Sequence, residues 1–153
     1  LMAHDKSKGY VSNIEGYTPL FYLAFPKFTR WLIESSLPDV RPMDNVAMGA
    51  DEPTEDEYTI GTYTPYGYYT GFIFPRNFDL YSKYLTFDGM PKHHKKWKKA
   101  FIYMIKMLTV GHKGKQLFLK NPSLSYSIPD ILEMYPNAKF IHTYRNPYKV
   151  YSS

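Results

Sequence analysis

The residue types best suited to binding phosphate lie near the end of the chain, around Arg145. A run rich in aromatic and β-branched residues, 139–144, ends in this arginine, and Asn146 and Pro147 follow it. Asparagine is a good N-cap and proline suits the first helical position, so we expect a helix to begin here. The free N–H groups of a helix start and a guanidinium both attract an anion. Ser153, eight residues after Arg145, adds a hydroxyl on the same face. This pattern is typical of half of a phosphate site.

A second cation, Lys120, follows a short apolar run that begins at Gln116. Residues 125–135 then predict a helix, because apolar residues recur there at the i, i+3, i+4 and i+7 spacing. The run 139–144 predicts a second strand. A strand–helix–strand unit most simply forms a right-handed crossover in a parallel sheet. Lys120 and Arg145 would then both lie at carboxyl ends of strands, where open α/β sheets bind ligands.

These motifs resemble the nucleotide-binding segment of sulfotransferases that use 3′-phosphoadenosine 5′-phosphosulfate (PAPS) as the donor. The resemblance is strongest in residues 116–153, which contain Leu119-Lys120-Asn121-Pro122 and Arg145-Asn146-Pro147-Tyr148-Lys149-Val150. It implies that Arg145 and Ser153 bind the 3′-phosphate of the donor. It also implies that Lys120 lies near the sulfuryl group, that no metal takes part, and that the fold is α/β, with a P-loop-NTPase-like parallel sheet flanked by helices.

Residues 1–115 resemble the broad microbial branch of this family more loosely, through Gly9-Tyr-Val-Ser, Pro42-Met-Asp-Asn-Val, Glu55-Asp-Glu-Tyr and Phe87-Asp-Gly-Met. The loop that wraps the 5′-phosphosulfate in the family is missing, since the chain has neither Gly-Lys-Ser/Thr nor Ser-Gly-Thr-Thr. We therefore expect residues 1–153 to be a fragment of one domain, cut at both ends and inactive alone. Residues 1–115 should be mostly helical with an aromatic loop, and 116–153 should form strand–helix–strand–helix.

The general base is the least certain part of the expected site. Cytosolic members of the family commonly carry a histidine two residues after the lysine, where this chain has Pro122. Transfer requires a group that removes a proton from the acceptor, and the candidates are Glu57 and Glu15. Glu57 has a structural alternative, because Thr54-x-x-Glu57 also matches a helix capping box.

The basic run 92–99 suggests a nucleic-acid or membrane surface, but another interpretation fits it better. Apolar residues from Trp97 to Leu108 recur at helical spacing, so residues 95–110 predict an amphipathic helix whose first turn carries solvated lysines. His93 and His94 are adjacent and lack further ligands at metal-binding spacing. His142 lies in a predicted strand, and we expect it to be packed.

The stretch 58–78 is dense in tyrosine, phenylalanine, glycine and proline and has no clean period. We expect a loop with short extended pieces, which either lines an acceptor pocket or packs as ordinary surface. Further helices are expected over residues 1–5, 19–34 and 78–85 and after Thr54. Residues 38–53 should form an irregular connection.

Composition sets the remaining bounds. The 153 residues include 44% hydrophobic and 18% aromatic residues, which argues against disorder. A net charge of +5 suits an anionic ligand but does not indicate nucleic-acid binding. No cysteine is present, and no apolar run is long enough to span a membrane.

The expected partners are thus the nucleotide donor and a small-molecule or glycan acceptor with a hydroxyl or amine. Two alternatives stay open, a P-loop kinase relative and a non-catalytic basic binding module. The sequence leaves the compartment undecided.

Overall fold

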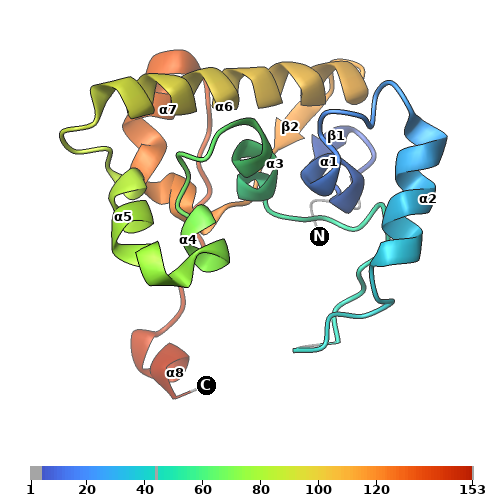
Figure 1. Ribbon diagram of the computed structural model, residues 1–153, viewed down its shortest axis with the longest axis horizontal. Helices are drawn as coiled ribbons and strands as arrows, with labels where there is room; N and C mark the ends of the chain where they lie inside the picture. The colour runs from blue at the N-terminus through green and yellow to red at the C-terminus, as the bar shows by residue number, and fades with distance from the viewer. Residues whose placement is uncertain (1–4, 44, 153) are drawn as a thin grey trace.

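The computed structural model describes residues 5–43 and 45–152, and helices dominate it (Figure 1). The elements, with η for 3-10 helices, are β1 (Lys8–Tyr10), α1 (Asn13–Tyr17), α2 (Pro26–Ser36), α3 (Asp56–Tyr63), α4 (Thr70–Ile73), η2 (Pro75–Asn77), α5 (Phe78–Ser82), η3 (Lys83–Leu85), α6 (Pro91–Gly111), β2 (Gln116–Phe118), η4 (Pro122–Ser127), α7 (Ile128–Met134) and α8 (Pro147–Tyr151).

Helix α6 is the longest described element, and the core forms along one of its faces. It runs across the molecule above α1, α3 and α5 (Figure 1). Its apolar stripe is buried as its period predicts, and the stripe packs against Ile60 of α3, Ile131 of α7 and Val11 after β1. The buried stripe consists of Trp97, Ala100, Phe101, Met104 and Leu108. The helix begins at Pro91, earlier than expected, because proline suits the first helical position.

The sheet is parallel, as expected, but one of its two strands differs from the prediction. β1 pairs with β2 in the register Lys8↔Gln116, Gly9↔Leu117 and Tyr10↔Phe118. The strand predicted over 139–144 is wrong for the described structure, where this segment is exposed and belongs to no sheet. The aromatic and β-branched residues of this segment favour an extended backbone. A β-strand also needs a neighbouring strand to pair with, and the local sequence does not specify that neighbour.

The helix predicted over 19–34 begins later, at Pro26. Residues 18–25 form turns instead, because proline disfavours helical backbone in the residue before it, and Phe25 has φ −132° and ψ 60°. The buried side chains of this segment are not its largest apolar ones. Phe28 is 56% exposed, whereas Tyr22, Thr29 and Ile33 are buried.

The aromatic stretch 58–78 forms short helices rather than a loop with extended pieces, which corrects the prediction. Its rings pack on one another, often edge to face, as Tyr68 does on Phe72 and on Phe78. Such ring packing has no period, so the sequence pattern missed it.

Three further expectations agree with the structure. A helix follows Thr54, residues 78–85 form α5 and η3, and the described residues of the connection, 38–43 and 45–53, are irregular. The helix predicted over 1–5 lies almost wholly outside the described residues. No helix in the described part of the chain is long and apolar enough to cross a bilayer.

Candidate active site

The carboxyl ends of β1 and β2 lie next to each other because the two strands are parallel. The segment that leads into α3 touches the chain after both strands. Thr54 N–H donates to the Val11 carbonyl at 2.8 Å, and the Thr59 hydroxyl donates to the Glu15 carbonyl at 3.3 Å. Asn121, after β2, contacts Glu57 of α3. The candidate site therefore lies around the start of α3, beside the carboxyl ends of the two strands. Open α/β sheets commonly bind ligands at the carboxyl ends of their strands.

Lys120 forms an ion pair with Glu55, whose carboxylate also accepts a hydrogen bond from the Tyr69 hydroxyl. Burial and the Glu55 carboxylate raise the pKa of Tyr69, so this hydroxyl remains a donor at neutral pH. The Lys120 side chain is 64% exposed, and its ammonium group is open to a ligand. Sequence reasoning quoted Glu55 in a motif but did not identify it as the partner of Lys120.

Glu57 is buried and fixes the loop that carries Lys120. One of its carboxylate oxygens, Oε2, accepts from Asn121 Nδ2 at 2.8 Å and from Ser123 Oγ at 2.9 Å. Burial raises the pKa of Glu57. The capping-box interpretation of Thr54 and Glu57 is wrong, because Glu55 is the N-cap of α3 and makes no side-chain cap.

Asp56, between these two glutamates, is fully buried, and neither carboxyl oxygen has a hydrogen-bond partner among the described residues. Burial raises its pKa to about 7, and the charge of Glu57 acts in the same direction. No sequence signal distinguishes this acid from its neighbours, since only packing decides which of three consecutive acids faces inward.

Glu15, the other candidate base, belongs to a second cluster. Its Oε2 accepts from the Ser12 N–H at 2.9 Å and the Ser12 hydroxyl at 3.0 Å, so the capping box of this protein lies at α1. Its Oε1 lies 2.9 Å from His112 Nε2. His112 follows α6 and was not singled out in the sequence, because it lies 97 residues beyond Glu15.

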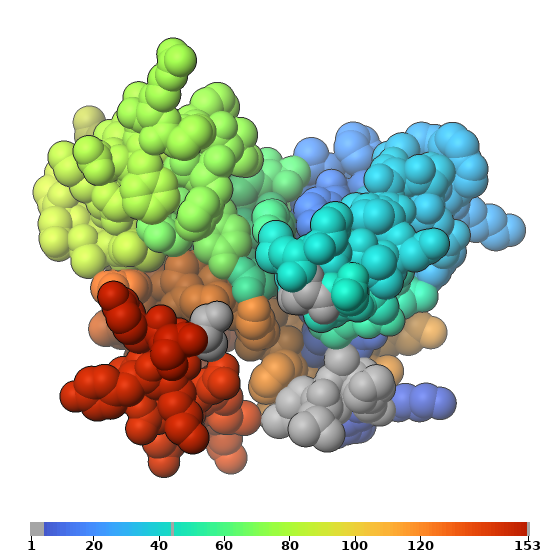
Figure 2. Space-filling model, turned by 90° about the horizontal axis from the view of Figure 1, so that it is seen from below, coloured from blue at the N-terminus to red at the C-terminus, as the bar shows by residue number. Residues whose placement is uncertain are grey.

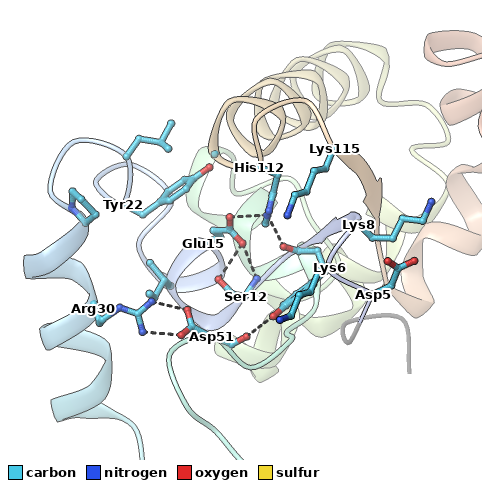
Figure 3. A pocket seen from close by; sticks show the side chains of 15 residues that line it. Asp5, Lys6, Lys8, Ser12, Glu15, Tyr22, Arg30, Asp51, His112 and Lys115 are labelled. Atoms are coloured by element: carbon cyan, nitrogen blue, oxygen red, sulfur yellow. Dashed lines mark hydrogen bonds and ion pairs between the residues drawn. The ribbon is translucent and has the colours of Figure 1, made fainter.

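A cavity of about 680 Å³ opens beside this second cluster (Figure 3). Glu15 and His112 line it, together with Arg30, which forms a two-pronged ion pair with Asp51 across distances of 2.7 and 2.8 Å. Lys120 does not line this cavity.

Arg145 is exposed and precedes the short helix α8. The Asn146 side chain caps α8, as predicted, by accepting from the N–H groups of Tyr148 and Lys149. These N–H groups are thus already bonded, so of the anion-binding groups expected here the structure shows only the Arg145 side chain exposed. Figures 1 and 2 show α8 on the opposite side of the molecule from α2. Ser153 lies outside the described residues.

The basic run 92–99 forms the first turns of α6, and two of its side chains contact Asp130 of α7. The Asp130 carboxylate lies 2.7 Å from His94 and 2.9 Å from Lys98. His93 stacks on Tyr66. His142 is exposed, so the expectation that it is packed is wrong. Within residues 5–43 and 45–152 no group of three or more His, Cys, Asp or Glu side chains is arranged for a metal ion.

Comparison with known proteins identifies two similar relatives, each called omega-hydroxy-beta-dihydromenaquinone-9 sulfotransferase Stf3, from Mycobacterium bovis and Mycobacterium tuberculosis. Both are 32% identical to this chain over 157 residues, an alignment that covers 100% of the chain and 39% of each relative. No solved structure matches significantly. Residues 20–153 match the sequence profile of the sulfotransferase family. Because this match covers most of the length of the chain, the chain belongs to the sulfotransferase family.

Proposed function

We propose that the complete protein transfers a sulfuryl group from PAPS to an acceptor hydroxyl. The observation that carries this proposal is the position of Lys120, an exposed ammonium group at the carboxyl end of a parallel strand in a chain of the sulfotransferase family. The chain spans 39% of the length of its relatives, so the proposal concerns the complete protein.

Sulfuryl transfer resembles phosphoryl transfer in its demands, because positioning and charge stabilisation dominate the chemistry. Lys120 would stabilise negative charge on the transferring group or on its bridging oxygen. Glu55 holds that ammonium group in place through the ion pair. Arg145 and Ser153 would bind the 3′-phosphate of the donor, which gives the site its preference for a 3′-phosphorylated nucleotide.

Of the two candidate bases, Glu15 suits the role better. Glu57 binds Asn121 and Ser123 in the loop that carries Lys120, so we assign it to positioning that loop. Glu15 lines a cavity with room for an acceptor. The backbone carbonyl of Glu15 accepts a hydrogen bond from the Thr59 hydroxyl of α3. Thr59 lies one turn beyond the acids that contact the Lys120 loop.

The relatives are named for a hydroxylated dihydromenaquinone. For this chain we propose an acceptor of the same general kind, an apolar molecule that carries a hydroxyl group.

Titration calorimetry on the full-length protein tests the donor assignment, with 3′-phosphoadenosine 5′-phosphate and adenosine 5′-phosphate as paired ligands. We expect the wild-type protein to prefer the 3′-phosphorylated nucleotide. Arg145→Ala should weaken binding of that ligand by about tenfold to a hundredfold, the effect of one charged hydrogen bond, and should hardly change binding of adenosine 5′-phosphate.

Arg76→Ala is the matched control, because Arg76 is an exposed arginine in η2. It should leave both affinities unchanged. Equal losses in the two variants, or a wild-type preference for ATP over the 3′-phosphorylated nucleotide, would contradict the donor assignment.

A further inference from the structure

We propose that the cavity between α1, α2 and the end of α6 is the acceptor site, and that His112 positions Glu15 there as the base. This inference rests on the proposed function. It adds where the acceptor binds, which side of the acceptor is apolar, and a residue outside the motifs of the sequence.

The lining of the cavity has an apolar part, which we call the wall, and a polar part, which we call the floor. The wall consists of Ile14 from α1, Leu23 before α2 and Pro26 at the start of α2. Glu15 and His112 lie on the floor. A volume of about 680 Å³ falls within the usual range for small-molecule sites. Most of the lining side chains are charged or polar, so the cavity would hold the polar end of an acceptor, with its apolar part against Ile14, Leu23 and Pro26.

The hydrogen bonds on the floor fix the proton on His112. Its Nε2 lies 2.9 Å from the Tyr10 carbonyl oxygen and 2.9 Å from Glu15 Oε1. A carbonyl oxygen accepts only, so Nε2 must carry a hydrogen, which it shares with the carboxylate. The Glu15 carboxylate raises the pKa of His112, which favours the charged donor form, although Lys115 nearby opposes this. His112 therefore acts as a donor that orients Glu15.

The contacts with Ser12 are explained by capping of α1 alone, but the contact with His112 is not. His112 comes from the far end of α6, and it meets Glu15 beside the cavity (Figure 3). The Glu15 side chain is only 8% exposed, so an acceptor hydroxyl in the cavity would meet a carboxylate largely shielded from water.

Three lysines, Lys6, Lys8 and Lys115, line the side of the cavity away from α2. The Lys8 ammonium group donates to the Gln116 side chain, whereas the ammonium groups of Lys6 and Lys115 have no hydrogen-bond partner among the described residues. The donor sulfuryl group and the sulfate ester formed from it are both anionic. These cations beside the floor would attract the incoming group and stabilise the product.

The reaction in this site is a single displacement. The acceptor oxygen forms a bond to sulfur while the bond from sulfur to the bridging phosphate oxygen breaks. That oxygen leaves with the electron pair as part of the nucleotide. The acceptor proton passes to Glu15, and His112 keeps its own proton throughout.

The role of His112 is tested with His112→Ala in the full-length protein, using PAPS and the phenol 2-naphthol as the acceptor probe. We expect kcat to fall by about tenfold to a hundredfold, the scale expected when a catalytic group is misplaced. The pH profile of kcat should change shape, and nucleotide affinity should stay constant. His112→Gln, which keeps a donor, should recover part of the rate.

His94→Ala is the matched control, since His94 lies on α6 and pairs with Asp130 at 2.7 Å, outside the cavity. It should lower stability without changing the pH profile. If both histidine variants change kcat and its pH profile alike, His112 has only a structural role and the inference is wrong.

The location of the acceptor is tested by filling the cavity. Leu23→Trp should raise KM for 2-naphthol by about tenfold or more, because the ring would occupy the apolar wall. Leu20→Trp is the control, since Leu20 lies in the same turn segment but does not line the cavity. Both variants should bind 3′-phosphoadenosine 5′-phosphate like the wild-type protein.

Separate outcomes distinguish this inference from the proposed function. A wild-type protein that does not bind the 3′-phosphorylated nucleotide would contradict the function itself. A protein that binds this nucleotide but has no activity with 2-naphthol, or that treats the two tryptophan variants alike, would overturn the acceptor site alone.

Discussion

At the scale of single residues, three consecutive acids at the start of α3 have three different environments. Glu55 reaches outward to Lys120, Asp56 is buried without a hydrogen-bond partner among the described residues, and Glu57 is buried but bonded to the loop after β2. Less than one helical turn separates these environments. The chemistry of each acid therefore follows from its direction on the helix and not from its type.

Asp56 makes the stability of the protein depend on pH. Its pKa is about 7 in the folded chain against 3.8 for a free aspartate, so the folded state holds a proton that the unfolded state releases. The contribution of Asp56 to stability should be complete below about pH 4 and fall by roughly 1 kcal/mol per pH unit as the pH rises toward 7. Denaturant titrations of the wild-type protein and Asp56→Asn across this range measure the effect.

Asp56→Asn should flatten this dependence, because the side chain no longer ionises. Its advantage over the wild-type protein should grow up to pH 7 and then stay constant. Parallel pH curves for the two proteins would show that Asp56 is ionised in the folded state and that its predicted burial effect is absent.

At the scale of elements, β1 and the end of α6 fit together closely. A Cβ added at Gly9 in β1 would lie 2.6 Å from Cγ of His112, too close for the ring to keep its place beside Glu15. Gly9→Ala should therefore destabilise the protein and lower its transferase rate together. Thermal unfolding and PAPS turnover on the full-length protein provide the two measurements.

Gly61→Ala is the matched control for this substitution. Gly61 lies within α3, and an added Cβ there meets nothing within 4 Å. Alanine is favoured over glycine inside a helix by up to about 1 kcal/mol, so this variant should be slightly more stable. Destabilisation of similar size in both variants would contradict the close fit of β1 and His112.

Sequence predicted the elements whose signal is local. The apolar period of α6 and the asparagine and proline at the start of α8 are properties of neighbouring residues, and both helices are present. Pairing is not local, which explains why the run 139–144 was expected as a strand and why Lys8–Tyr10 was not. The same limit applies to the candidate site, where local motifs draw attention to Lys120 but not to its partner Glu55 or to the contact of His112 with Glu15.

At the scale of the whole molecule, two possible ligand regions meet around α3. The Lys120 loop contacts the acids at its start, and the cavity floor contacts Thr59 one turn later. Arg145 lies outside both regions, in the exposed segment before α8. A P-loop-like sheet remains a prediction, because the described sheet has only two strands.

Turnover of PAPS by the full-length protein, with and without Lys120, tests the central claim most directly. With radiolabelled PAPS and 2-naphthol, the wild-type protein should release 3′-phosphoadenosine 5′-phosphate and form a labelled sulfate ester. Lys120→Ala should lower kcat by about a hundredfold to a thousandfold, as expected for loss of a group that stabilises transition-state charge. Lys95→Ala, at an exposed lysine of α6, should have no effect. A wild-type protein that turns over no PAPS, or equal rates with and without Lys120, would contradict the claim.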